Sequence, residues 1–342
     1  MSKPVTLDDV ARLAGVSAKT VSRVINDEPH VTPGKRETVK KAIASLGYRP
    51  NMAARSLASS RNFLVCAISP WLESSYFQEL HSQLIRACKA RGYHLVIEEI
   101  KPRHQGALLE LENSLSAMRC ERAILSPSAA DDDAILGLLD RMGVNYVRIS
   151  PTQRAERSHA VSVDQAQGMK LVADYLWSLG HRRFAVVADP HPQAPMRRSE
   201  LLTAYLKDLG CSPQDIVTVP LNYRLPGLHA GRECARTILQ SAVRPSAIFS
   251  YADEVAAGII GHALEQGLRI PGDLSVVGFD DFYVAQLVWP PLTTVRVSLE
   301  GVATQAVSLL LDTSCDDSSR HILYPVELVV RGSTSAPPAN AS

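Results

Sequence analysis

The sequence lacks several features that place a protein in a class at once. Its six cysteines lie far apart and include no C-x-x-C pair, which argues against a zinc site and against a secreted disulfide framework. No uninterrupted run of 18 apolar residues occurs, and the first ten residues, MSKPVTLDDV, contain no apolar signal segment. We therefore expect a cytoplasmic protein without a metal or other cofactor.

The motifs of common catalytic chemistries are also missing. The 342 residues contain no G-x-S-x-G elbow, no H-E-x-x-H pair and no G-x-x-x-x-G-K-[ST] loop. Asp253, Asp280 and Asp281 could supply the carboxylate pair of a glycosidase, but no other feature supports that reaction. We expect a protein that is not an enzyme.

Charge is distributed unevenly along the chain. The net charge is only +1, yet residues 1–60 carry ten Lys and Arg against five Asp and Glu, a net of +5. The remaining 282 residues carry 26 against 30, a net of −4. A small basic module on a slightly acidic body suggests that one end meets an anionic partner, although a solvated basic face gives the same count.

Three short helices are predicted in the first 50 residues. Their ends are marked by residues that favour caps and turns, namely Thr6, Asp9, Gly15, Ser17, Asn26, Thr32, Pro33 and Gly47. Their inner faces would close a small core of Leu7, Val10, Leu13, Val21, Val39, Ile43 and Leu46.

The second of these helices, in GVSAKTVSRVIN, has an unusually polar face. Val16, Val21 and Val24 can point inward. Five polar side chains can reach outward, namely Ser17, Lys19, Thr20, Ser22 and Arg23. This division suits a helix that lies on a phosphate backbone.

From Phe63 onward the pattern changes to short apolar runs separated by amphipathic helices. The runs are FLVCAIS, YHLVIEE, RAILS, YVRIS, FAVVAD, SAIFS and LSVVGF. Apolar strands that alternate with helices indicate parallel sheets covered on both faces, and about 270 residues exceed one doubly wound sheet, so we expect two lobes. The tail GSTSAPPANAS is rich in Pro, Ser and Ala, and we expect residues 335–342 to be disordered.

The stretch TLDDVARLAGVSAKTVSRVIN, followed by VTPGKRETVKKAIASLGYRPNMAARSLAS, resembles the headpiece of the LacI/GalR family of bacterial transcriptional regulators. SLGHRRFAVVADP, DLSVVGFDDF, PPLTTV and VELVVRGSTS are similar to landmarks of the same family's core. The resemblance implies an all-α helix-turn-helix headpiece at 1–50, a hinge helix at 51–62, and an α/β core of two doubly wound parallel-sheet lobes at 63–334. That core would be similar to periplasmic sugar-binding proteins, with the chain crossing between lobes near 162, 290 and 322.

The resemblance also implies how the headpiece meets DNA. The second helix would enter the major groove, with Ala18 near a thymine methyl and with Lys19 and Arg23 on guanine. Short polar side chains would bond phosphates instead, although capping or solvent exposure remains an alternative for each hydroxyl; these are Thr6, Ser17, Thr20, Ser22 and Asn26.

In the hinge, Leu57 would wedge into the minor groove, and small Ala54 and Ala58 would let two hinge helices approach closely. Asn51 and Arg55 could contact bases or phosphates nearby, whereas a flexible linker is the alternative interpretation. Two wedges require a homodimer on a near-palindromic operator. The tail lacks the leucine-rich helix of a lac-repressor-type tetramer, although a tetramer through other surfaces stays open.

An effector, expected to be a carbohydrate, would bind between the lobes. The residues that the family pattern assigns to it are Tyr76, Phe77, Arg198, Asp253 and Asp280, although either aspartate could instead only cap the next helix. Two departures matter, because Ala252 replaces a usual Asn and Leu201-Leu202 replaces a usual Gly-aromatic pair. The expected function is an effector-controlled repressor; an activator or a corepressor-requiring regulator is the alternative, and a carbohydrate-binding protein without a DNA role is a remote one.

Overall fold

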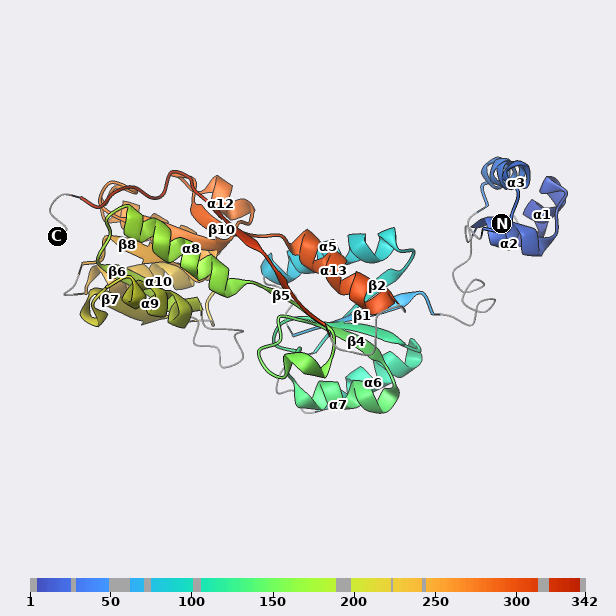
Figure 1. The fold of residues 1–342 in the computed structure, drawn as a ribbon, viewed down its shortest axis with the longest axis horizontal. Helices are drawn as coiled ribbons and strands as arrows, with labels where there is room; N and C mark the ends of the chain where they lie inside the picture. The colour runs from blue at the N-terminus through green and yellow to red at the C-terminus, as the bar shows by residue number, and fades with distance from the viewer. Residues whose placement is uncertain are drawn as a thin grey trace. The chain divides into compact units, whose positions relative to one another are not determined.

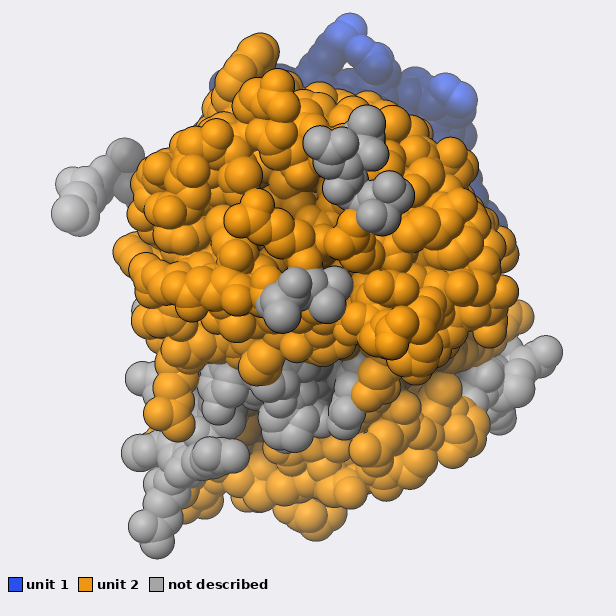
Figure 2. Space-filling model, turned by 90° about the vertical axis from the view of Figure 1, so that its left-hand side faces the viewer, with its two compact units in different colours: residues 1–63 blue, residues 64–342 orange. Residues whose placement is uncertain are grey.

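The computed structural model describes residues 5–25, 29–48, 62–70, 75–100, 106–188, 198–222, 224–241, 244–312 and 320–338. The chain divides into two compact units, residues 1–63 and 64–342, which Figure 2 colours separately. In the described ranges no helix is both long and apolar enough to cross a membrane.

The described residues of the first unit form the helices α1 (Leu7–Ala14), α2 (Ala18–Ile25) and α3 (Pro33–Leu46). The predicted capping box of Thr6 and Asp9 is present, and Gly15 and Gly47 end their helices in the left-handed conformation that glycine adopts without strain. Their buried side chains are Val10, Ala11, Ala14, Val21, Val24, Val39 and Ala42.

Leu13 was expected in this small core and is not there. Its side chain is 55% exposed, because Val10, Ala11 and Ala14 form the inward face of α1 and Leu13 lies on the opposite side. The interior is therefore built largely from alanine and valine, which lets three short helices approach closely.

The first lobe of the second unit is built on a six-stranded sheet of order β11-β5-β4-β3-β1-β2, with every neighbouring pair parallel. Its strands are β1 (Leu64–Ser69), β2 (His94–Glu99), β3 (Arg122–Leu125), β4 (Asn145–Ile149), β5 (Ala160–Val163) and β11 (His321–Tyr324). Helices α5 (Ser75–Ala90) and α13 (Leu299–Leu311) cover one face, and α6 (Ala107–Ala117) and α7 (Asp133–Met142) cover the other (Figure 1).

The second lobe repeats the plan with order β12-β10-β9-β8-β6-β7, in which only the β10–β12 pair is antiparallel. Its strands are β6 (Phe184–Ala188), β7 (Ile216–Pro220), β8 (Ala247–Phe249), β9 (Ser275–Asp280), β10 (Thr293–Val297) and β12 (Val326–Val329). Its helices are α8 (Gln165–Ser178), α9 (Arg198–Asp208), α10 (Gly227–Leu239), α11 (Asp253–Glu265) and α12 (Tyr283–Leu287). The expected fold class, two doubly wound lobes, is confirmed.

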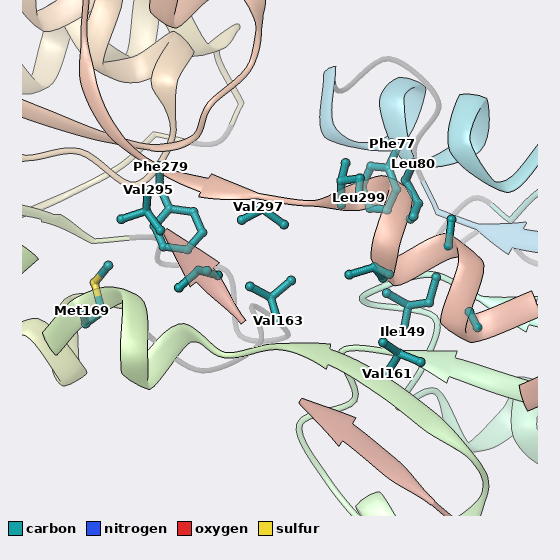
Figure 3. Packing of buried hydrophobic residues seen from close by; sticks show 14 of the residues in the cluster. Phe77, Leu80, Ile149, Val161, Val163, Met169, Phe279, Val295, Val297 and Leu299 are labelled. Atoms are coloured by element: carbon teal, nitrogen blue, oxygen red, sulfur yellow. The ribbon is translucent and has the colours of Figure 1, made fainter. Parts of the chain in front are cut away.

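The chain passes between the lobes three times, at 163–165, 297–299 and 324–326. The second crossing was expected near 290 but lies later, because Thr293–Val297 still pairs with β9 and β12 in the second lobe. Figure 3 shows Val163 and Val297 on the crossing segments between the apolar groups of the two lobes.

The end of the chain differs from expectation. Residues 335–338 were predicted to be disordered, but Ser335 donates its N–H to the Ser275 hydroxyl at 3.0 Å, and its carbonyl lies 2.9 Å from Nε2 of the buried His181. These bonds fix residue 335 on the second lobe, which a composition-based prediction does not register.

Candidate DNA-binding helix and interlobe binding site

Helix α2 buries Val21 and Val24, and its Ala18 and Ile25 are partly buried against the same small core. Ser17 and Lys19 are exposed, whereas Ala18, Thr20, Ser22 and Arg23 are half-buried. The described residues that were predicted to contact DNA therefore share one helix and the turn before it, apart from Thr6 at the start of α1.

Two of the predicted phosphate ligands also cap helices. The Ser17 hydroxyl accepts from the Thr20 backbone N–H at 3.2 Å and lies 2.9 Å from the Thr20 hydroxyl. The Thr6 hydroxyl donates to the Asp9 carboxylate at 2.6 Å. Capping, the alternative interpretation, is thus observed for Ser17 and Thr6, and it fixes their hydroxyls at helix N-termini, where backbone N–H groups also favour an anion.

The remaining predicted DNA contacts lie outside the described residues. They are Asn26 and the hinge positions Asn51, Ala54, Arg55, Leu57 and Ala58. Their roles stay predictions.

Between the lobes, Arg198 is held by groups from three parts of the second lobe. Its Nε donates to Gln165 Oε1 at 3.1 Å, and its Nη1 donates to the Tyr251 carbonyl at 2.7 Å. The guanidinium stacks on the Phe279 ring at 3.7 Å, and its Nη2 lies 3.8 Å from Asp280 Oδ1. These contacts fix the orientation of the guanidinium before any ligand arrives.

Asp280 ends β9 in a strained backbone conformation, with φ at +105°, and Asp281 follows at +59°. Asp280 is 6% exposed, and its Oδ1 has no hydrogen-bond partner among the described residues. Burial raises its pKa to about 7; nearby Arg198 lowers it and the charge of Glu254 raises it further. A buried carboxylate with an unsatisfied oxygen is suited to receive a donor from a ligand.

Asp253 is bonded entirely within the protein. It is completely buried, Oδ1 accepts from the Thr294 hydroxyl at 2.6 Å, and Oδ2 accepts from the Phe282 N–H at 2.8 Å. Burial raises its pKa well above the ordinary value. A side chain on Gly278 would collide with its carboxylate, so that glycine permits the close approach. This placement favours a structural role, bracing the loop after β9.

The first lobe contributes Tyr76, whose ring lies 6.5 Å from that of Phe282 in the second lobe. Burial, and secondly the charge of Asp280, raise the pKa of the Tyr76 phenol. The adjacent Phe77 packs instead with Leu80 and Leu299 in the first lobe's core, as Figure 3 shows. Of the five predicted effector residues, Tyr76, Arg198 and Asp280 are the ones that converge.

Sequence reasoning missed Gln165, Glu254 and Ser75. The Ser75 hydroxyl at the start of α5 donates to Glu254 Oε1 at the start of α11, which joins the two lobes directly. The position of Glu254, next to Asp253, was a usable signal, whereas Gln165 lies 33 residues before Arg198 and only the fold brings them together.

The two departures from the family pattern have clear positions. Ala252 precedes α11 and supplies no side-chain cap, so no amide is present there. Leu202 is buried and Leu201 packs against the same apolar cluster, so this pair serves the core.

Comparisons with known proteins agree with this arrangement. Residues 6–51 match the family described as bacterial regulatory proteins, lacI family, and residues 173–334 match the periplasmic binding protein-like domain. The transcriptional regulator MalR of Streptomyces coelicolor is 31% identical over 344 residues, covering 97% of each chain. The lac repressor dimer bound to operator and the anti-inducer ONPF superposes with a TM-score of 0.77 at 27% identity, covering 98% of this chain and 100% of that one. A CelR–cellobiose complex gives 0.68 at 28% identity, covering 96% and 99%.

Proposed function

The chain belongs to the lacI family of bacterial regulatory proteins, and from this we propose that it is a sequence-specific DNA-binding transcriptional repressor. Its operator affinity is set by a small molecule, a sugar or sugar derivative, bound between the lobes of its core. The observation that carries the proposal is the polar face of α2 on a separate helical unit. It acts in the cytoplasm with its operator, and no catalytic role is assigned, since the relatives are named as regulators.

We assign base reading to the start of α2, which enters the major groove. Lys19 and Arg23 donate to guanine, and Ala18 offers a methyl to thymine. Backbone phosphates are bound by the short polar side chains Thr6, Ser17, Thr20, Ser22 and Asn26.

The regulator works as a homodimer on a near-palindromic operator; the similar lac repressor is bound to its operator as a dimer. The headpiece spans 1–50, the hinge helix 51–62 and the core 63–334. Leu57 wedges into the minor groove, Ala54 and Ala58 allow the two hinge helices to approach, and Asn51 and Arg55 contact the duplex. The exposed apolar side chains of Tyr283, Leu287 and Trp289 suit the subunit contact, since Trp289 is 79% exposed.

We assign effector contact to Tyr76, Arg198 and Asp280, and a supporting role to Asp253 and Phe77. These residues come from both lobes. A ligand that binds one arrangement of the lobes more tightly therefore favours that arrangement, and the change in arrangement alters how the core supports the hinge helices. Whether binding lowers or raises operator affinity decides between an inducer and a corepressor.

The test is selection of genomic DNA fragments by the purified full chain at near-physiological salt. A near-palindrome with an easily kinked central step is expected. Lys19→Ala and Arg23→Ala should each weaken specific binding by about 1–3 kcal/mol and relax the preference at one position. Leu57→Gly should leave only weak, salt-sensitive binding. Recovery of fragments without a shared motif, with or without added metabolites, would contradict the proposal.

A further inference from the structure

Two consecutive aspartates at the end of β9 are neutralised very differently. Asp281 is paired with two arginines: Arg296 Nε donates to its Oδ2 at 2.7 Å, and Arg331 Nη2 lies 2.6 Å from its Oδ1 in an ion pair. Its Oδ1, like that of Asp280, has no partner with hydrogen-bond geometry among the described residues, so the difference between the two aspartates lies in the number and distance of their counter-charges. Asp280 has only Arg198, at 3.8 Å, and its Oδ1 has no hydrogen-bond partner among the described residues. The charge of Asp280 is therefore poorly compensated.

Arg198 cannot move closer without giving up contacts. Two of its donors are engaged by Gln165 and by the Tyr251 carbonyl, and its plane is stacked on Phe279. Its distance from Asp280 is thus set by the second lobe itself, and the carboxylate stays available to a different cation.

A second carboxylate adds to the negative charge. Glu254 acts electrostatically on Asp280, and its Oε1 is bound by Ser75 of the first lobe. Among the residues that the structure describes around Asp280, the charges of Asp280, Glu254 and Arg198 sum to one negative charge when both acids are ionised. A net buried charge is costly unless a counter-charge is placed beside it.

Resting on the proposed effector role of this site, we propose that the effector carries a protonated amine that binds between Asp280 and Glu254. A hydroxyl would satisfy Oδ1 of Asp280 but would leave the charge in place, whereas an ammonium group does both. Burial is the main cause that raises the pKa of Asp280 to about 7; Arg198 lowers it, and the charge of Glu254 raises it further.

The surrounding rings suit the rest of an amino sugar. The rings of Tyr76 and Phe282, one from each lobe, lie 6.5 Å apart with their planes tilted by 57°, and the Tyr251 ring lies 4.7 Å from the Arg198 guanidinium. Aromatic rings pack against the apolar face of a pyranose and also favour a nearby cation. An amino sugar therefore fits the chemistry better than a neutral or acidic one.

The experiment titrates the full chain with sets of sugars that differ at one substituent. Glucosamine, galactosamine and mannosamine are each compared with the parent hexose and with the N-acetyl form, which keeps the nitrogen without its charge. Binding is measured by calorimetry and by melting temperature at pH ~7 in phosphate buffer, because amine buffers such as Tris would compete for the same site.

At least one amine is expected to bind tenfold or more tightly than both of its neutral counterparts. Glu254→Gln should reduce that ratio to near one, while the matched Glu112→Gln, which removes an exposed carboxylate on α6, should leave it unchanged. Equal binding of neutral sugars, or a panel in which no amine exceeds its counterparts, overturns the proposal. The titration needs no DNA, so a failure of operator binding, measured in parallel, would count against the proposed function alone.

Discussion

Arg148 of the first lobe and Arg198 of the second lobe are both largely buried, and the two are held differently. Arg148 on β4 is completely buried and donates only to groups of the first lobe, namely the Ser158 hydroxyl, the carbonyls of Ala130, Gln153 and Arg154, and Asp131. Arg198 donates to Gln165 and to the Tyr251 carbonyl, and it lies 3.8 Å from Asp280, whose Oδ1 has no hydrogen-bond partner among the described residues. A buried charge whose donors are all engaged within one lobe stabilises that lobe, whereas one beside an unsatisfied partner at a boundary is available to a ligand.

The largest effect is expected from removing the saturated arginine. Arg148→Met removes the donor that binds the carbonyls of Ala130, Gln153 and Arg154, and it leaves Asp131 with Thr152 and Gln153 as donors but without its counter-charge. The substitution should lower the free energy of unfolding by about 5 kcal/mol. Urea denaturation of the full chain measures this. A urea midpoint equal to that of the wild type would show that the Arg148 network contributes little to stability. The claimed difference between Arg148 and Arg198 would then be wrong.

The second prediction concerns pH and Asp280. Because its pKa rises from 3.8 to about 7 on folding, the folded chain binds more protons between these values, so stability falls as pH rises and the full penalty is present above pH 7. That penalty tends toward roughly 4 kcal/mol. Arg198, Glu254, Asp253 and Tyr76 set the field around this carboxyl.

Asp280→Asn should abolish this part of the pH dependence. The free energy of unfolding of the variant should therefore rise relative to that of the wild type as the pH rises from about 5.5 to 7.5. Urea unfolding across that range tests it. If the free energy of unfolding changed with pH in the same way in both proteins, the charge of Asp280 would be compensated in the folded chain. Arg148 and Arg198 would then differ less in how their partners are neutralised.

A milder change separates binding from stability. Arg198→Lys keeps the charge but loses the planar contacts to Gln165 and Phe279. It should therefore lower the free energy of unfolding by only about 1–2 kcal/mol. The effector response, measured as the shift in operator affinity on adding ligand, should fall at least tenfold. A variant that responds like the wild type would place the effector elsewhere.

The smallest effect is expected at the surface of the first lobe. Arg154 pairs with Asp133, but both side chains are largely solvent-exposed. Arg154→Ala should therefore lower stability by less than about 1 kcal/mol, and salt should reduce even that. A loss as large as that of Arg148→Met would show that the Arg154 side chain belongs to the buried network.

Periodicity predicted the two lobes, because the strands of a covered parallel sheet are apolar on both faces. It did not single out β5, β7, β10, β11 or β12. The segment HILY of β11 alternates between exposed and half-buried positions at a sheet edge, and nothing local distinguishes such a segment from a loop. Leu13 was misplaced for a related reason, since hydrophobicity alone does not decide which side of a short helix faces inward.

At the site, Arg198 and Asp280 were predictable from the family pattern, and both lie where a ligand between the lobes would meet them. The partners that orient them were not. Gln165 and Tyr251 are distant in sequence, and their effect on Arg198 depends on how α8 and β8 pack beside β9. Such tertiary information is absent from local propensity.

The three crossings between the lobes have a consequence for synthesis on the ribosome. The first lobe is synthesised up to the end of β5 once residue 163 has been added. The elements that complete it, α13 and β11, follow only after residue 298. At about 5–20 residues per second, on the order of ten seconds or more separates the two events. During that interval the face later covered by α13 is open on the nascent chain, and any chain that stops before residue 299 leaves its first lobe unfinished.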